Sequence, residues 1–158
     1  ITYDQLKIAD IMVVYVPLIN INNFIFDRFG SFEYKHSASI LINRVLTIGK
    51  NTKDSKMYVN IGATHFEIVV IENNLLKFYN RFEFITKEDF IYYLLFTAEQ
   101  LQLNPEEFPL VLMGSVDPND ELYKIAYKYI RDVNLLNSDS MLYSNDSSSK
   151  HFTLLNSL

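Results

Sequence analysis

Two glycine-containing turns hold the residues of this sequence that are best suited to chemistry. The first, 60–65 (NIGATH), follows an apolar run, and a hairpin there would expose backbone N–H groups able to hold a phosphate. The second, 112–117 (LMGSVD), ends another apolar run shortly before an expected helix, whose N-terminus could also hold an anion. An ordinary turn is the simpler interpretation of either one alone, but their order and spacing add weight. The candidate nucleotide-binding residues are Asn60, Gly62, Ala63, Thr64, His65, Gly114 and Ser115.

No other residues form a convincing catalytic or metal site. The histidines His36, His65 and His151 lack a second histidine or a carboxylate at ligand spacing on a shared helix. Ser37 is better explained as a helix cap than as a nucleophile, and no G-x-S-x-G sequence occurs. The acidic pair 88–89 is better explained by helix capping than by acid–base catalysis. We therefore assign no catalytic residue and no metal ligand.

Composition narrows the class of protein. The chain has 158 residues, 49% of them hydrophobic, which is enough for one core. Its net charge of −5 argues against non-specific nucleic-acid binding, which needs clustered Lys and Arg. It has no cysteine, which excludes disulfides and thiol catalysis and suits a reducing cytoplasm. The apolar runs are shorter than the ~20 residues of a membrane span. We expect a cytoplasmic protein that binds neither nucleic acid nor membrane.

The segment 57–84 positions the first turn, because it is patterned as three strands in a meander. The first strand, 57–61, is short and apolar, the second alternates from Phe66, and the third places its apolar residues on one face. Thr86 then opens the strongest helix of the chain. Asp89 stands where a capping box usually has Glu or Gln.

The flanking segments predict further strands and helices around this meander. Residues 1–7 are expected to be loose. Strands are expected at 11–16, which should be buried on both faces, and at 32–36, 110–113 and 133–136. Helices are expected at 20–29, at 38–48 after a Ser37 cap, and from Asp117 as N-cap with Pro118 as the first helical residue. The pattern predicts an α/β fold with one mixed sheet and helices on both faces.

Two sets of residues carry a resemblance to known families. The hairpin 60–68 (NIGATHFEI) resembles the phosphate-binding hairpin of the actin, sugar-kinase and heat-shock-chaperone ATPase superfamily, roughly Asp-hydrophobic-Gly-Gly-Gly-Thr-Phe-Asp-Val. Segments 16–24, 29–37 and 86–100 resemble a family of uncharacterised Bacteroidota proteins with an actin-like fold. The resemblance covers most of the chain and implies an actin-like ATPase (ribonuclease H-like) lobe. It also implies that ATP and Mg²⁺ are the candidate cofactors, although the residues alone assign none.

This sequence departs from the superfamily motif at the positions that matter for catalysis. The hairpin aspartate, which helps to hold the metal-bound nucleotide or to orient water, is replaced here by the uncharged Asn60. Ala63 and Thr64 replace two glycines, and their Cβ atoms crowd a loop that should approach phosphate closely. His65 stands at the threonine position, and Ser115 replaces the second glycine of the adenosine-binding pair.

Two functions from different classes follow as expectations. The altered motif favours an inert interaction or scaffold protein with an actin-like fold. The alternative is an ATP-binding protein or ATPase whose site is completed by a missing N-terminal lobe, since the superfamily binds nucleotide between two lobes and this chain resembles the C-terminal part. We expect residues 1–136 to form one lobe and 137–158 a tail that can pack back on it. Half of a two-lobed molecule should expose apolar surface, so its expected partners are the missing lobe, another copy or an unidentified protein.

Overall fold

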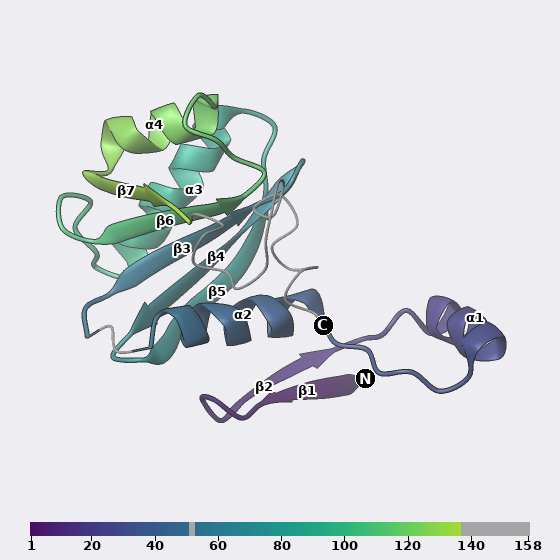
Figure 1. The fold of residues 1–158 in the computed structure, drawn as a ribbon. Coiled ribbons are helices and arrows are strands. Elements are labelled where there is room, and N and C mark those ends of the chain that lie inside the picture. Colours follow the sequence, from purple (N-terminus) through teal and green to yellow (C-terminus); the bar gives the residue numbers. More distant parts are fainter. Residues whose placement is uncertain (51–52, 137–158) are drawn as a thin grey trace.

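Five strands form one mixed sheet in the order β5–β4–β3–β6–β7 (Figure 1). The computed structural model of the chain describes residues 1–50 and 53–136. Strands β3 (Lys56–Ile61), β4 (His65–Glu72) and β5 (Leu75–Glu83) pair antiparallel, which confirms the predicted meander. Strand β6 (Pro109–Gly114) pairs parallel with β3, and β7 (Asp132–Leu135) pairs parallel with β6. The predicted tail, including His151, lies outside the described residues, and the proposed lobe boundary stays a prediction.

The turn between β4 and β5 shows how the sequence sets the register of the meander. Asn73 and Asn74 have φ angles of 51° and 62°, in the left-handed region that asparagine tolerates better than most residues. A two-residue turn with both φ angles positive matches the right-handed twist of paired strands, so it favours a tight hairpin. Glu72 consequently pairs directly with Leu75 across the turn.

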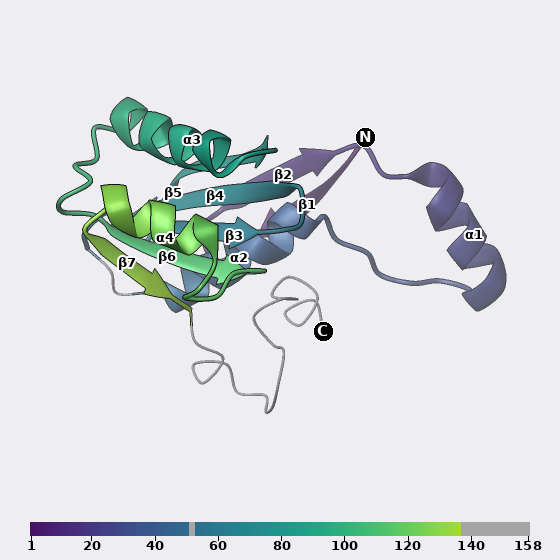
Figure 2. The same ribbon diagram turned by 90° about the horizontal axis from the view of Figure 1, so that it is seen from above.

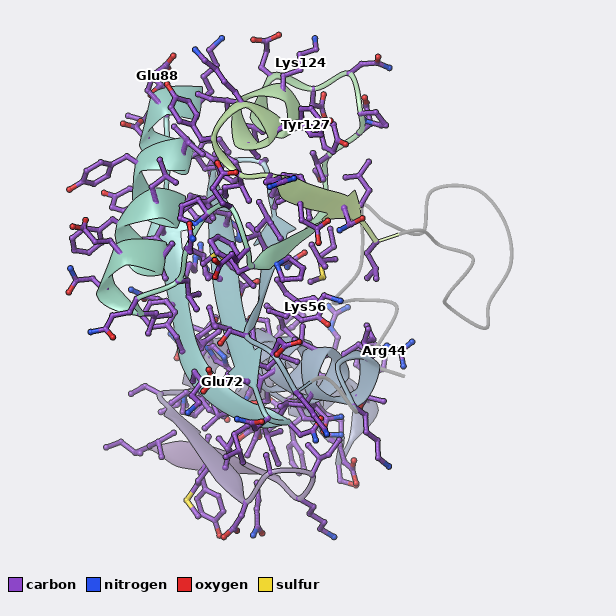
Figure 3. All side chains as sticks on the ribbon, turned by 90° about the vertical axis from the view of Figure 1, so that its left-hand side faces the viewer. Arg44, Lys56, Glu72, Glu88, Lys124 and Tyr127 are labelled. Carbon is purple, nitrogen blue, oxygen red and sulfur yellow. The ribbon has the colours of Figure 1, made fainter. Side chains whose placement is uncertain are left out.

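Helices cover both faces of the sheet. On one face α3 (Lys87–Gln100) and α4 (Glu121–Tyr129) lie side by side, with the side chains of Glu88 and Lys124 directed outward (Figure 3). Phe90 and Leu94 of α3 are fully buried against this face. Helix α2 (Ser37–Ile48) covers the opposite face, where alternate strand residues pack against it. The structure therefore confirms the predicted class, an α/β fold with a mixed sheet between helices.

Local hydrogen bonds start α3 where the sequence indicates. The Asp89 amide donates to Thr86 Oγ1, while the Thr86 amide donates to the Asp89 carboxylate. This reciprocal pair is the predicted capping box, with Asp89 in the Glu position.

The first 36 residues, which we call the arm, extend from one end of this domain. A hairpin of β1 (Thr2–Leu6) and β2 (Ile11–Tyr15) forms a separate two-stranded sheet. Helix α1 (Ile19–Phe29) follows and buries none of its residues. Figure 2 shows α1 standing apart from the five-stranded sheet. Gly30 follows the last residue of α1 with a φ of 78°, in agreement with the helix predicted to end at residue 29.

One aspartate joins the hairpin to α2. Asp4 accepts hydrogen bonds from the Tyr15 hydroxyl at 3.0 Å, the His36 amide at 2.8 Å and the Ser39 hydroxyl at 2.6 Å. Burial alone raises the pKa of Asp4, but these three hydrogen bonds outweigh it and hold that pKa below its usual value. Burial and the bond to Asp4 raise the pKa of Tyr15 to about 12.

Three predictions about the arm and one about the cap of α2 are wrong. Residues 1–7 are not loose, because Thr2–Leu6 pairs with Ile11–Tyr15. Segment 11–16 is not buried on both faces, and its Val13 lies in the hairpin rather than the main sheet. No strand forms at 32–36. Ser37 is not the cap of α2, since His36 holds that position and its Nδ1 accepts from the Ala38 amide.

Candidate functional site

The two predicted turns lie side by side at the carboxyl ends of β3 and β6. Because these strands are parallel and adjacent, Asn60 pairs in register with Met113, and Ile61 with Gly114. The Ser115 amide donates a hydrogen bond of 2.7 Å to the Ile61 carbonyl oxygen, which joins the turns directly. The carboxyl ends of neighbouring strands are where open α/β sheets usually bind ligands. The order of the motifs therefore predicted a real juxtaposition.

Gly114 is required by the junction between the strands. Its φ is 90°, in a region that disfavours residues with a side chain. An added Cβ would collide with the Ile61 carbonyl oxygen and lie 2.9 Å from Asn60 Oδ1. Strand packing therefore accounts for this glycine without a ligand.

The hairpin tip uses part of its hydrogen-bonding capacity internally. The Gly62 amide donates 2.8 Å to the His65 carbonyl oxygen, and the Thr64 carbonyl accepts from the Phe84 amide at 3.2 Å. A Cβ on Gly62 would lie 3.0 Å from His65 Cε1, a tight contact that a small shift of the ring would relieve. Ala63 and Thr64 are exposed and carry the outermost amides of the turn. A phosphate at this tip would meet those two amides and their side chains.

A buried polar cluster fixes the side chain of Asn60. Its Nδ2 donates 3.0 Å to Glu67 Oε2, and the Tyr79 hydroxyl donates 2.8 Å to Glu67 Oε1. Glu67 is only 5% exposed, so these donors compensate for the burial of a polar side chain. Burial, and then the neighbouring Glu67 carboxylate, raise the pKa of Tyr79, which keeps that hydroxyl a donor.

Sequence reasoning missed Glu67 and Tyr79. The alternation of 66–70 predicts a strand but does not by itself indicate the surroundings of the Glu67 carboxylate. The available signal was that Val69 and Ile71, on the same side of β4 as Glu67, are apolar, so this side had to be buried. A carboxylate on a buried face needs donors, and Asn60 is its direct partner across the strands.

The cluster does not fit a superfamily-type magnesium site. Magnesium requires near-octahedral oxygen coordination and commonly binds through carboxylates. Asn60 brings a neutral amide to the motif position, and both oxygens of Glu67 already accept hydrogen bonds. Within residues 1–50 and 53–136, no group of three or more His, Cys, Asp or Glu residues could hold a metal ion.

The second turn does not lead directly into a helix, so one prediction is wrong. Helix α4 begins at Glu121 with Asp120 as its N-cap, rather than with Asp117 and Pro118. Asp117 instead closes a turn, since its amide donates to the Asp120 carboxylate at 2.7 Å and its own carboxylate accepts from Asn119. Asp117, Asp120 and Glu121 lie at this N-terminus, where Glu121 pairs with Lys87 at 2.7 Å and with Lys124 at 3.3 Å. The carboxylates of Asp117 and Asp120 oppose the binding of an anion there.

The sheet order, the parallel β3–β6 pair and the helices on both faces define an actin-like ATPase fold. The chain matches a crystal structure from Bacteroides thetaiotaomicron VPI-5482, described as a protein with actin-like ATPase fold and unknown function, with a TM-score of 0.82 and 22% identity. The chain itself belongs to the family described as "Protein of unknown function (DUF3822)", whose family model matches residues 1–133. No protein with curated annotation matches it.

The match to the solved structure covers different shares of the two chains. It covers 98% of this chain but only 56% of the Bacteroides chain, so the chain spans little more than half of that relative. Among the helices of the described residues, none has the length and apolar character needed to cross a membrane.

Proposed function

We propose that this chain acts as a catalytically inactive interaction protein built on an actin-like fold. The observation that carries the proposal is the state of Asn60, the residue at the position of the superfamily's catalytic aspartate. Its amide is bound to a buried carboxylate, so that position supplies no negative charge to a metal-bound nucleotide and no base to water.

Two further features support loss of turnover. The Gly62 and Ser115 amides donate to carbonyl oxygens of the protein, which removes two of the donors expected to meet phosphate. The acidic residues around the start of α4 oppose a triphosphate near the second turn. Exposed apolar side chains on the arm support the interaction part of the proposal.

A second candidate is nucleotide binding completed by another domain. Its support is the adjacency of the Asn60–His65 and Gly114–Ser115 turns at the ends of parallel strands. The extent of the Bacteroides match adds to it, because a longer chain has room for a second set of binding residues. Binding can persist after catalysis is lost, so binding and turnover are tested separately.

The deciding experiment combines isothermal titration of Mg-ATP with a phosphate-release assay. The proposal predicts weak or no heat of binding and no release above that of ATP alone. A restoring variant, Asn60→Asp with Ala63→Gly and Glu67→Gln, returns the motif charge without placing two carboxylates together. Phosphate release by the wild type that disappears in Asn60→Ala would contradict the inactive assignment. Binding without release, lost in Asn60→Ala, would support the second candidate.

A further inference from the structure

The exposed apolar side chains of the molecule are concentrated on the arm. Among the described residues, most of the large hydrophobic side chains that remain exposed lie in residues 1–34. Tyr3, Met12 and Val14 are 60%, 56% and 61% exposed, and the strand register places them together on the outer face of the hairpin. Helix α1 adds Phe24, Phe26 and Phe29, each more than half exposed. Apolar patches of this kind mark surfaces that bind another protein surface.

The inner side of the hairpin packs on α2 through Leu6, Ile11 and Val13, whereas α1 buries none of its residues. A two-stranded hairpin is marginal by itself in water, and so is a helix of eleven residues. The inner side of the hairpin is fixed to α2 through Asp4, which leaves its outer side directed away from the sheet. Because β1 and β2 pair only with each other in the described residues, each also presents an edge with backbone donors and acceptors.

The arm also carries an open groove. It has a volume of about 380 Å³ and lies between α1 and the segment that follows it, lined by residues including Pro17, Asn22, Phe26, Phe32 and Tyr34. Residues 1–36 contain four acidic and three basic residues, so charge does not select the partner. The surface instead suits a partner with apolar side chains and a strand edge of its own.

The solved relative indicates where such a partner comes from. Its match covers 98% of this chain and therefore nearly all of the arm. The match covers only 56% of the Bacteroides chain, so a large part of that chain lies outside it. The arm is thus present in a polypeptide that has a domain's worth of further sequence. The N-terminus lies at the end of the hairpin from which the chain continues to α1 (Figure 2).

We propose that the outer face of the hairpin and α1 form the docking surface for a further domain of the same polypeptide, equivalent to the unmatched part of that relative. This domain covers Tyr3, Met12 and Val14, inserts an apolar side chain into the α1 groove, and adds backbone hydrogen bonds at a free edge of the hairpin. The proposal is independent of nucleotide binding.

The test compares hydrogen exchange in the full-length native polypeptide with exchange in the 158-residue chain. Both are measured at a concentration where light scattering gives a monomeric mass for the native polypeptide. Amides of α1 and of β1 should exchange at least about tenfold more slowly in the native polypeptide. In the 158-residue chain these amides exchange through local fraying, whereas in the native polypeptide the docked domain must first separate from the arm. The combined variant Val14→Ser with Phe26→Ser should abolish that difference without changing the mass. The matched control, Ile85→Ser, alters an apolar side chain that is 94% exposed outside the arm and should leave the protection intact.

Three results would overturn the docking proposal. The first is equal exchange of the arm in both polypeptides. The second is protection that appears only with a dimeric mass, which would make a second copy the occupant. The third is a native polypeptide that proves no longer than the 158 residues, since no further domain would then exist.

Discussion

Replacing Asn60 by aspartate tests the buried cluster directly. The substitution restores the motif residue of the superfamily, but it places a second carboxylate where Asn60 Nδ2 now donates to Glu67 Oε2 across 3.0 Å. Two unit charges at that separation repel by about 5 kcal/mol at an effective dielectric constant of about 20. Binding a proton to an ordinary carboxylate at pH 7 costs less, about 4 kcal/mol. The carboxylate pair should therefore take up one proton, and Asn60→Asp should lose about 4 kcal/mol of stability at pH 7.

The loss of stability in Asn60→Asp should depend on pH in a defined direction. The folded variant binds a proton that the unfolded chain releases above about pH 4, so its deficit relative to wild type grows as pH rises. We expect the deficit to shrink by about 1.4 kcal/mol for each pH unit between pH 7 and about pH 4. Urea unfolding of variant and wild type at pH 7, 6 and 5 measures it, and the difference at each pH cancels groups that titrate in both proteins.

A double variant supplies the control. Asn60→Asp with Glu67→Gln keeps one carboxylate and one amide at the same two positions, with the Tyr79 hydroxyl still able to donate. Its stability should lie within about 1 kcal/mol of wild type, because the interaction is exchanged rather than removed. A single-variant loss below about 1 kcal/mol that does not change with pH would refute the cluster as the controlling feature.

Three other predictions follow from the same structure. Leu94→Ala should cost about 2–5 kcal/mol, because the side chain is fully buried beneath α3, and a loss below about 0.5 kcal/mol in urea would refute its core position. Gly114→Ala should lower the melting temperature measured by calorimetry, since its φ is positive and the new Cβ meets backbone. Gly30→Ala, which has a positive φ but nothing within 4 Å of the new Cβ, should lower it less. The pKa of Asp4 is lowered in the folded protein, so lowering the pH through that pKa should protonate the carboxylate, remove its stabilising contribution and loosen the hairpin. Hydrogen exchange of the hairpin amides that does not change in an Asp4→Asn variant would contradict this prediction.

The sequence predicted the meander and α3 well because their signals are local. Alternation and the capping box at Thr86 each act over a few residues, and each appears in the structure as expected. The arm could not be predicted in this way. Segment 11–16 has the apolar content of a buried strand, but its pairing partner is β1 rather than the sheet, which no local pattern specifies.

The candidate site was predicted only in part, because some of its features are local in sequence and others depend on strand pairing. The glycines marked the two turns, and parallel pairing of β3 with β6 brought them together. The hydrogen bonds of Asn60 and Tyr79 to Glu67 depend on the register of three strands, so they became visible only once that register was known. Helix α4 starts later than predicted because the Asp117 amide donates to the Asp120 carboxylate and the Asp117 carboxylate accepts from the Asn119 amide, which holds 117–120 in a turn.

The parallel pairing of β3 and β6 also has a consequence for the order of folding. The meander closes through short hairpins, whereas Met57 pairs with Leu110 only after α3 and the intervening chain have formed a crossover. Contacts between residues far apart in sequence form late, because the loop entropy must be overcome first. The junction at Gly114, and with it the candidate site, should therefore assemble after the meander. Pulse-labelled hydrogen exchange during refolding should protect β4 amides before those of β6, and a nascent chain that ends before β6 would carry the hairpin of the site without its second turn.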